Sequence, residues 1–68
     1  MFWVQLYGRG AEGDLHSEDV AIPFEAYVIA GEMARGTLSA QTCSWGKPEG
    51  YRILDDIKRV ITEARFEG

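Results

Sequence analysis

Residues 51–66 read YRILDDIKRVITEARF, and this stretch has the most regular apolar spacing in the chain. On a helical wheel, one arc of about 120° holds its aliphatic side chains, which are Ile53, Leu54, Ile57, Val60, Ile61 and Ala64. Asp55 and Arg59, four residues apart, would support the exposed side of such a helix. The spacing predicts a C-terminal helix that supplies much of the core. Ile57→Asp would then unfold the chain, because it would bury an unpaired charge.

The N-terminal residues follow a different period. Residues 2–7 (FWVQLY) alternate between two sets at a period of two, which predicts a strand. The aliphatic-rich set would face the core, whereas Trp3 and Tyr7 would lie partly exposed on the other face. Residues 8–19 are expected to form a loop, and residues 37–45 a weaker second strand.

Residues 24–35 fit either a helix or a strand, and the content of Ala, Glu, Met and Arg after Ile29 favours the helix. We therefore expect a small α+β domain over residues 1–68. Two antiparallel strands would pack against a long C-terminal helix and a second helix at residues 23–36. The alternative is a three-stranded antiparallel sheet backed only by the C-terminal helix.

The length and composition narrow the class of protein. A chain of 68 residues makes one domain and buries only about 60% of the surface that its unfolded form exposes. Cys43 is the only cysteine, so no disulfide can form within the chain. The short apolar N-terminus lacks the basic region of a signal peptide, and no stretch approaches the ~20 apolar residues of a membrane span. We expect a cytoplasmic protein without membrane contact, stabilised by tight packing or self-association.

Three glycines after the first strand match the dinucleotide-binding spacing G-x-G-x-x-G, at Gly8, Gly10 and Gly13. That fingerprint requires a helix whose N-terminal N–H groups point at a pyrophosphate. Here the following residues include Asp14 and Pro23, which oppose both a sustained helix and a bound phosphate. The motif therefore predicts a turning loop and no nucleotide cofactor.

The sequence gives little support for a catalytic site or a metal site. Cys43 and His16 could form a nucleophile and its base, but nothing around them forms a signature. A metal site from Asp14, His16 and Glu18 would need an extended loop that points all three side chains to one side. We expect a protein that is not an enzyme and that binds neither a metal nor a cofactor.

Charge is distributed unevenly along the chain. The net charge is −4, and no Lys or Arg occurs between Arg9 and Arg35. That interval carries six acidic residues, namely Glu12, Asp14, Glu18, Asp19, Glu25 and Glu32. Trp3 and Tyr7 could stack on bases, but the basic surface that phosphates require is missing. The pattern disfavours direct nucleic-acid binding and favours a larger protein partner with a basic surface.

In size and charge alone, the chain resembles phage-encoded inhibitors of host defences, anti-CRISPR proteins included. That resemblance implies a non-enzymatic protein that blocks a nucleic-acid-handling host system in the host cytoplasm. The expected partner-binding residues are Glu12, Asp14, Glu18, Asp19, Trp3 and Tyr7. The alternative is a self-associating structural or accessory subunit, a homo-oligomer whose interface uses Ile29, Met33 and Trp45.

Overall fold

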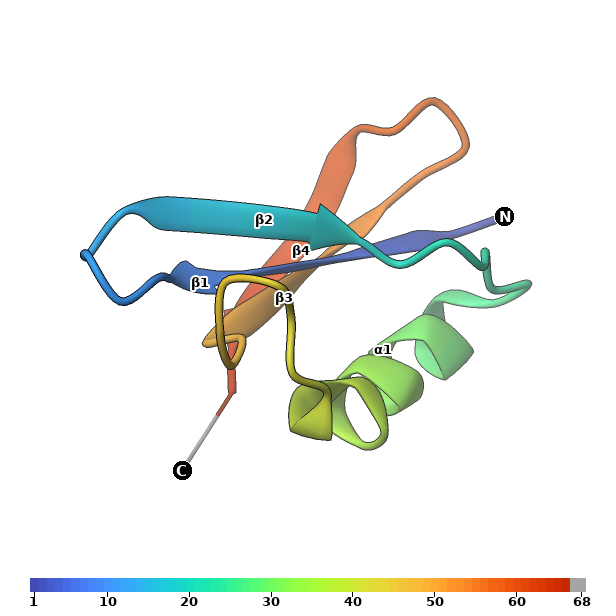
Figure 1. Cartoon of the computed structure of the whole chain (residues 1–68). Coiled ribbons are helices and arrows are strands. Elements are labelled where there is room, and N and C mark those ends of the chain that lie inside the picture. Colours follow the sequence, from blue (N-terminus) through green and yellow to red (C-terminus); the bar gives the residue numbers. More distant parts are fainter. Residues whose placement is uncertain (67–68) are drawn as a thin grey trace.

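Within residues 1–66, the fold consists of four antiparallel strands, one α-helix and one short 3-10 helix. The computed structural model describes residues 1–66. The strands are β1 (Trp3–Arg9), β2 (Leu15–Asp19), β3 (Gly50–Leu54) and β4 (Val60–Arg65), and they lie in the order β2-β1-β3-β4. Helix α1 (Tyr27–Arg35) and the short 3-10 helix η1 (Leu38–Ala40) connect β2 to β3 (Figure 1). The central strands are therefore β1 and β3, and the sheet edges are β2 and β4.

The predicted C-terminal helix is wrong, because residues 51–66 form most of the β3–β4 hairpin. Side chains of β3 alternate between the two faces of the sheet, so Tyr51 and Ile53 point into the core while Arg52 points out. Between the strands, the N–H of Lys58 donates to the carbonyl of Asp55 at 2.9 Å and closes a tight turn. The β-branched residues at the start of β4 favour a strand in that position.

The predictions for residues 8–19 and for residues 37–45 are also wrong. The expected loop at residues 8–19 contains β2, which pairs with β1 from Gln5↔Asp19 to Arg9↔Leu15. Residues 37–45 form no strand: η1 is followed by a turn in which Cys43 and Gly46 bond to each other through their backbones. The sheet therefore has four strands, which excludes both the two-stranded and the three-stranded arrangement.

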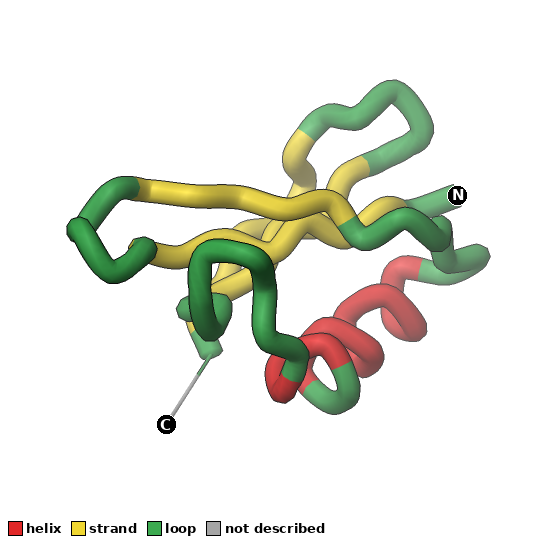
Figure 2. The backbone as a smooth tube through the Cα atoms, in the orientation of Figure 1, coloured by secondary structure: helices red, strands yellow, loops and turns green. Residues whose placement is uncertain are grey.

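Residues 24–35 do contain a helix, shorter than the predicted span of 23–36. α1 lies against one face of the sheet (Figure 2). It buries small residues, Ala30, Gly31 and Ala34, which allow its backbone to approach the strands closely. Val28 and Ile29, on the other side of the helix, are exposed.

The core lies between α1 and the sheet. The alternation predicted for residues 2–7 is confirmed, because Val4 and Leu6 are 1% and 0% exposed and face the helix. Ile53 completes the set of large, fully buried side chains. Trp3 and Tyr7 lie on the opposite face, which no helix covers among the described residues, and this open face carries the polar side chains discussed below.

Candidate functional site

The acidic residues expected to contact a partner lie along one edge of the sheet. Glu12 and Asp14 belong to the turn between β1 and β2, whereas Glu18 and Asp19 end β2 itself. Their carboxylates occur beside the outermost strand, and nothing among residues 1–66 pairs with its outer side. We call this set (Glu12, Asp14, Glu18 and Asp19) the acidic edge.

The backbone of β2 also presents free hydrogen-bonding groups. The Gly10 N–H donates to the carbonyl of Asp14 at 2.9 Å, and the Val20 N–H donates to the carbonyl of Val4 at 2.9 Å. The backbone groups of the even-numbered residues in this segment therefore point toward β1. Antiparallel ladders alternate, so the backbone N–H and C=O groups of Leu15, Ser17 and Asp19 turn outward. An added strand would find donors and acceptors at these three positions.

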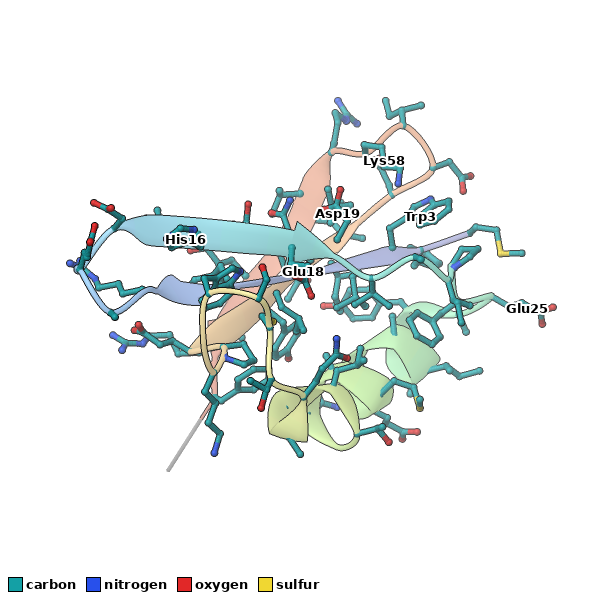
Figure 3. The ribbon with its side chains drawn as sticks, in the orientation of Figure 1. Trp3, His16, Glu18, Asp19, Glu25 and Lys58 are labelled. Atoms are coloured by element: carbon teal, nitrogen blue, oxygen red, sulfur yellow. The ribbon has the colours of Figure 1, made fainter. Side chains whose placement is uncertain are left out.

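The two carboxylates at the end of β2 point to opposite faces (Figure 3). Asp19 lies on the open face, where its Oδ1 accepts a hydrogen bond from Gln5 Nε2 at 2.9 Å. Glu18 lies on the helix-covered face and accepts a hydrogen bond from the Ser44 hydroxyl at 3.5 Å. The carboxylates of the acidic edge therefore lie on both faces of the sheet at β2 and do not form one flat surface.

A row of polar side chains crosses the open face. The row begins at Asp19 on β2, which accepts a hydrogen bond from Gln5 on β1. The Oε1 of Gln5 in turn accepts a hydrogen bond from Arg52 Nη1 at 2.9 Å. Arg52 Nε donates to Glu63 on β4 at 2.9 Å, so the row reaches the opposite edge. The Arg52 guanidinium also lies 4.5 Å from the centre of the Tyr7 ring. The Tyr7 ring thus contacts a cation of the same chain, and Trp3 borders a hollow on the same face.

That hollow is a cavity of about 320 Å³ on the open face, between the ends of β1, β2 and the β3–β4 turn. Its lining includes Trp3, Gln5, Asp19, Val20, Leu54 and Lys58. The Lys58 ammonium lies 3.4 Å from the centre of the Trp3 ring. The cavity thus combines an aromatic face, a carboxylate and a cation, and sequence analysis missed Lys58 because it placed this residue on a helix.

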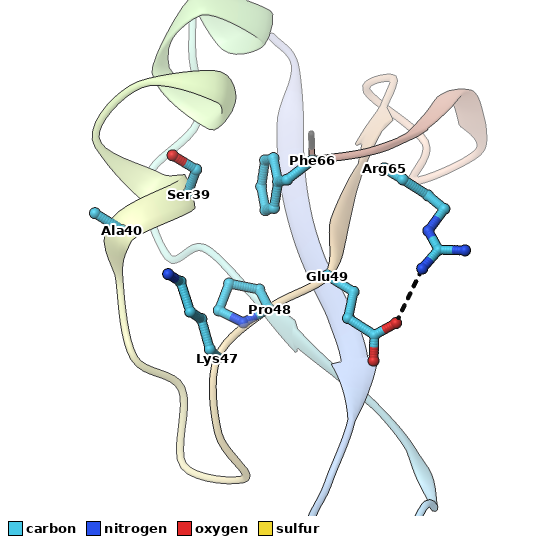
Figure 4. A pocket seen from close by; sticks show the side chains of 7 residues that line it. All are labelled: Ser39, Ala40, Lys47, Pro48, Glu49, Arg65 and Phe66. Atoms are coloured by element: carbon cyan, nitrogen blue, oxygen red, sulfur yellow. Dashed lines mark hydrogen bonds and ion pairs between the residues drawn. The ribbon is translucent and has the colours of Figure 1, made fainter. Parts of the chain in front are cut away.

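A second polar cavity, of about 430 Å³, lies between η1, the segment that precedes β3 and the end of β4 (Figure 4). Lys47 and Arg65 line it with Ser39 and Phe66. Glu49 is held there by two groups, since it accepts from Arg65 at 3.4 Å and from the backbone N–H of Arg9 at 2.8 Å. The Glu49 carboxylate is therefore already paired within the chain.

The residues expected to drive self-association separate into two environments. Ile29 is 46% exposed on the outer side of α1. Met33 and Trp45 are partly buried against the core. Trp45 also stacks on His16, with ring centres 5.7 Å apart. Of the three residues, Ile29 alone offers a largely exposed side chain.

The glycine motif has a packing role in this fold. A Cβ on Gly8 would lie 2.7 Å from the Trp45 ring, and one on Gly10 would lie 2.9 Å from His16. Gly13 occupies the turn with a φ of +85°, which favours glycine. The motif therefore makes room for the stacked rings beneath the β1–β2 hairpin.

Cys43 is buried. Burial raises the pKa of its thiol, and the nearby Glu18 carboxylate raises it further. A raised pKa disfavours the thiolate that a nucleophilic cysteine requires. His16 stacks on Trp45, so the two members of the hypothetical dyad serve packing in this arrangement.

Comparison with other proteins adds no assignment: no protein-family model, curated protein or solved structure matches the chain. Within residues 1–66, no cluster of three or more His, Cys, Asp or Glu side chains is arranged to hold a metal ion. In the same part of the chain, no helix has the length and apolar character needed to cross a membrane. The geometry of the acidic edge is therefore the main basis for a functional proposal.

Proposed function

We propose that this chain is a non-enzymatic binding protein that recognises a basic, extended segment of a larger protein by adding it as a strand to β2. The observation that carries the proposal is the position of Glu18 and Asp19 on an outermost strand, with Glu12 and Asp14 in the turn that precedes it. Backbone groups at Leu15, Ser17 and Asp19 would pair with the incoming segment. Such strand addition is a common mode of peptide recognition, in which backbone bonds supply affinity and side chains supply specificity.

The division of the carboxylates between two faces suits this binding mode. Successive side chains of an added strand point alternately to opposite faces of the sheet. Basic residues of the partner on the open face would meet Asp19, and those on the helix-covered face would meet Glu18. The lack of Lys and Arg between Arg9 and Arg35 would favour encounter with a positively charged segment.

A blocking role follows if the partner uses the same basic segment to bind nucleic acid. Occupation of that segment would then compete with phosphate groups, as expected for a phage-type, anti-CRISPR-like inhibitor in a host cytoplasm. The charge layout is the support for this more specific form of the proposal.

The test uses a synthetic peptide of alternating Lys and Val and measures its affinity for the wild-type protein and for four variants. Glu18→Lys/Asp19→Lys should weaken binding at least tenfold, because it places like charges on both sides of the added strand. Glu25→Lys/Glu32→Lys changes the net charge equally but alters acids outside β2, so it should have a much smaller effect. Equal losses in both double variants would show that net charge alone drives binding.

Ser17→Pro tests the backbone contribution. The Ser17 N–H points away from β1, so proline removes an outward donor and leaves the β1–β2 ladder bonded. Peptide affinity should fall although the circular dichroism spectrum stays native, and Ser17→Ala should bind normally. Full peptide affinity in the folded Ser17→Pro protein would exclude strand addition at β2.

Self-association remains the second candidate, supported by the exposed apolar side of α1. Val28 is 64% exposed and Ile29 46% exposed. On β4, Val60 is 51% exposed as well. A second copy of the chain could cover both regions. Sedimentation velocity of the wild-type protein and of Ile29→Glu would test this, and a concentration-independent monomer would exclude it.

A further inference from the structure

The cavity beside Trp3 has features of a site for an organic cation. The Lys58 ammonium already lies 3.4 Å from the centre of the Trp3 ring. Aromatic faces attract cations through the negative charge density above the ring, and tryptophan does so most strongly. The contact within the chain thus shows which kind of group this ring accepts.

Lys58 reaches the ring from a costly backbone conformation. Its φ of +66° lies in the left-handed region, and it is the only residue other than glycine with a positive φ among those described. In this conformation the Cβ of an L-residue lies too close to its own backbone, so it is unfavourable for a lysine. The Asp55 carboxylate holds the turn by accepting the N–H groups of Ile57 and Arg59, at 3.1 and 2.9 Å. The chain therefore keeps a lysine at a position where glycine is favoured.

Asp19 supplies a carboxylate to the same cavity of about 320 Å³. One of its oxygens accepts the Gln5 hydrogen bond, and a carboxylate has acceptor capacity for further donors. Leu54, only 8% exposed, contributes apolar surface to the lining. A guanidinium or ammonium group on an aliphatic stem would thus meet an aromatic face, a carboxylate and an apolar wall (Figure 3).

We propose that this cavity binds the guanidinium or ammonium group of an arginine or lysine side chain, and that Lys58 is an internal competitor for the Trp3 face. The source of that side chain rests on the proposed function: a strand added to β2 would run beside Asp19 and direct its open-face residue into the cavity. Displacement of the Lys58 ammonium would open the ring to the incoming cation. Binding would then be weakened by the cation that the chain itself supplies.

The test separates the cavity from strand addition by using two probes, ethylguanidinium and the alternating Lys and Val peptide. The readout is the indole N–H signals of Trp3 and Trp45 in nitrogen-15 NMR spectra. Lys58→Met keeps the stem and the turn conformation but removes the charge. It should bind ethylguanidinium about two- to fivefold more tightly than the wild type, the factor expected for losing one surface cation–π competitor. Ethylguanidinium should shift the indole N–H signal of Trp3 and leave that of Trp45 unchanged.

Lys47→Met is the matched control, since it makes the same charge change in a segment that does not line this cavity. Asp19→Asn in the Lys58→Met background should remove most of the gain. The inference would be overturned if Lys47→Met raised the affinity for ethylguanidinium as much as Lys58→Met does. It would also be overturned if ethylguanidinium left the Trp3 signal of folded Lys58→Met unchanged. If ethylguanidinium shifts the Trp3 signal but Ser17→Pro leaves the peptide affinity unchanged, the cation site is supported and strand addition is excluded. If only the peptide binds, and it leaves Trp3 unmoved, strand addition stands and the cation site fails.

Discussion

Arg52 and Tyr7 are joined across the two central strands: the Arg52 guanidinium lies 4.5 Å from the centre of the Tyr7 ring. The same group donates to Gln5 and to Glu63, each at 2.9 Å. One side chain of β3 thereby connects its neighbours on both sides. Its partner Gln5 also lines the proposed cation cavity.

Arg52→Lys should destabilise the protein by about 1 kcal/mol, because an ammonium cannot stack on Tyr7 and bond in two directions with the geometry of a planar guanidinium. Urea unfolding monitored by circular dichroism measures the change. Arg65→Lys is the control, since Arg65 is well exposed and makes one longer ion pair to Glu49. Similar losses in both variants would contradict the role given to Arg52.

Ile57→Asp distinguishes the hairpin from the helix predicted by the sequence. Ile57 is 70% exposed in the β3–β4 turn, so the substitution should change stability by less than about 0.5 kcal/mol. Ile53→Asp should unfold the domain, because Ile53 is 1% exposed and an unpaired buried charge costs several kcal/mol. Thermal melts of the two variants provide the comparison, and unfolding caused by Ile57→Asp would restore the helical interpretation.

Stability should depend on the ionisation of Asp55 in acid. The hydrogen bond from the backbone N–H of Arg59 is the main cause that holds the pKa of this carboxyl below its usual value. Desolvation opposes it, and smaller contributions from the Ile57 N–H and the Arg59 side chain add to the lowering. A folded pKa below the unfolded one means that the stabilisation is complete above the unfolded pKa and is lost as pH falls through the folded pKa.

The stability difference between the wild type and Asp55→Ala should therefore be constant near neutral pH and shrink below about pH 4. Urea titrations at several pH values give this difference, and carbon-13 NMR of the Asp55 carboxyl gives its pKa directly. A pKa at or above the usual aspartate value would contradict the described turn.

Lys58→Gly should be about 1 kcal/mol more stable than Lys58→Met, since both lack the ammonium and only glycine adopts a φ of +66° without steric cost. Chemical denaturation of the two variants measures this difference with the ammonium absent from both. If the methionine variant were the more stable one, the left-handed conformation at residue 58 would be wrong.

The local pattern of residues 2–7 was sufficient to predict β1 and the direction of its side chains. Its alternation is incompatible with a helix, and a face carrying Val4 and Leu6 had to be buried. The composition of residues 24–35 likewise indicated α1 before any contact was known. The acidic interval, with its lack of Lys and Arg, was also evident from the sequence.

Only the tertiary structure decided how residues 51–66 fold. Their aliphatic pairs, Ile53–Leu54 and Val60–Ile61, fit one side of a helix and also fit two strands separated by a turn. Pairing of β3 with the unsatisfied backbone of β1 selects the strands, because this places Tyr51 and Ile53 beside Val4 and Leu6 in one core.

The candidate sites depend on the same pairing. The acidic residues became the outer edge of the sheet only because β1 pairs with β3 on its other side. Lys58 came to lie over Trp3 only because residues 55–59 form a turn, which brings together two residues 55 positions apart in the chain. The sequence by itself determined the charges and the strand period, whereas long-range backbone pairing determined which side chains share a surface.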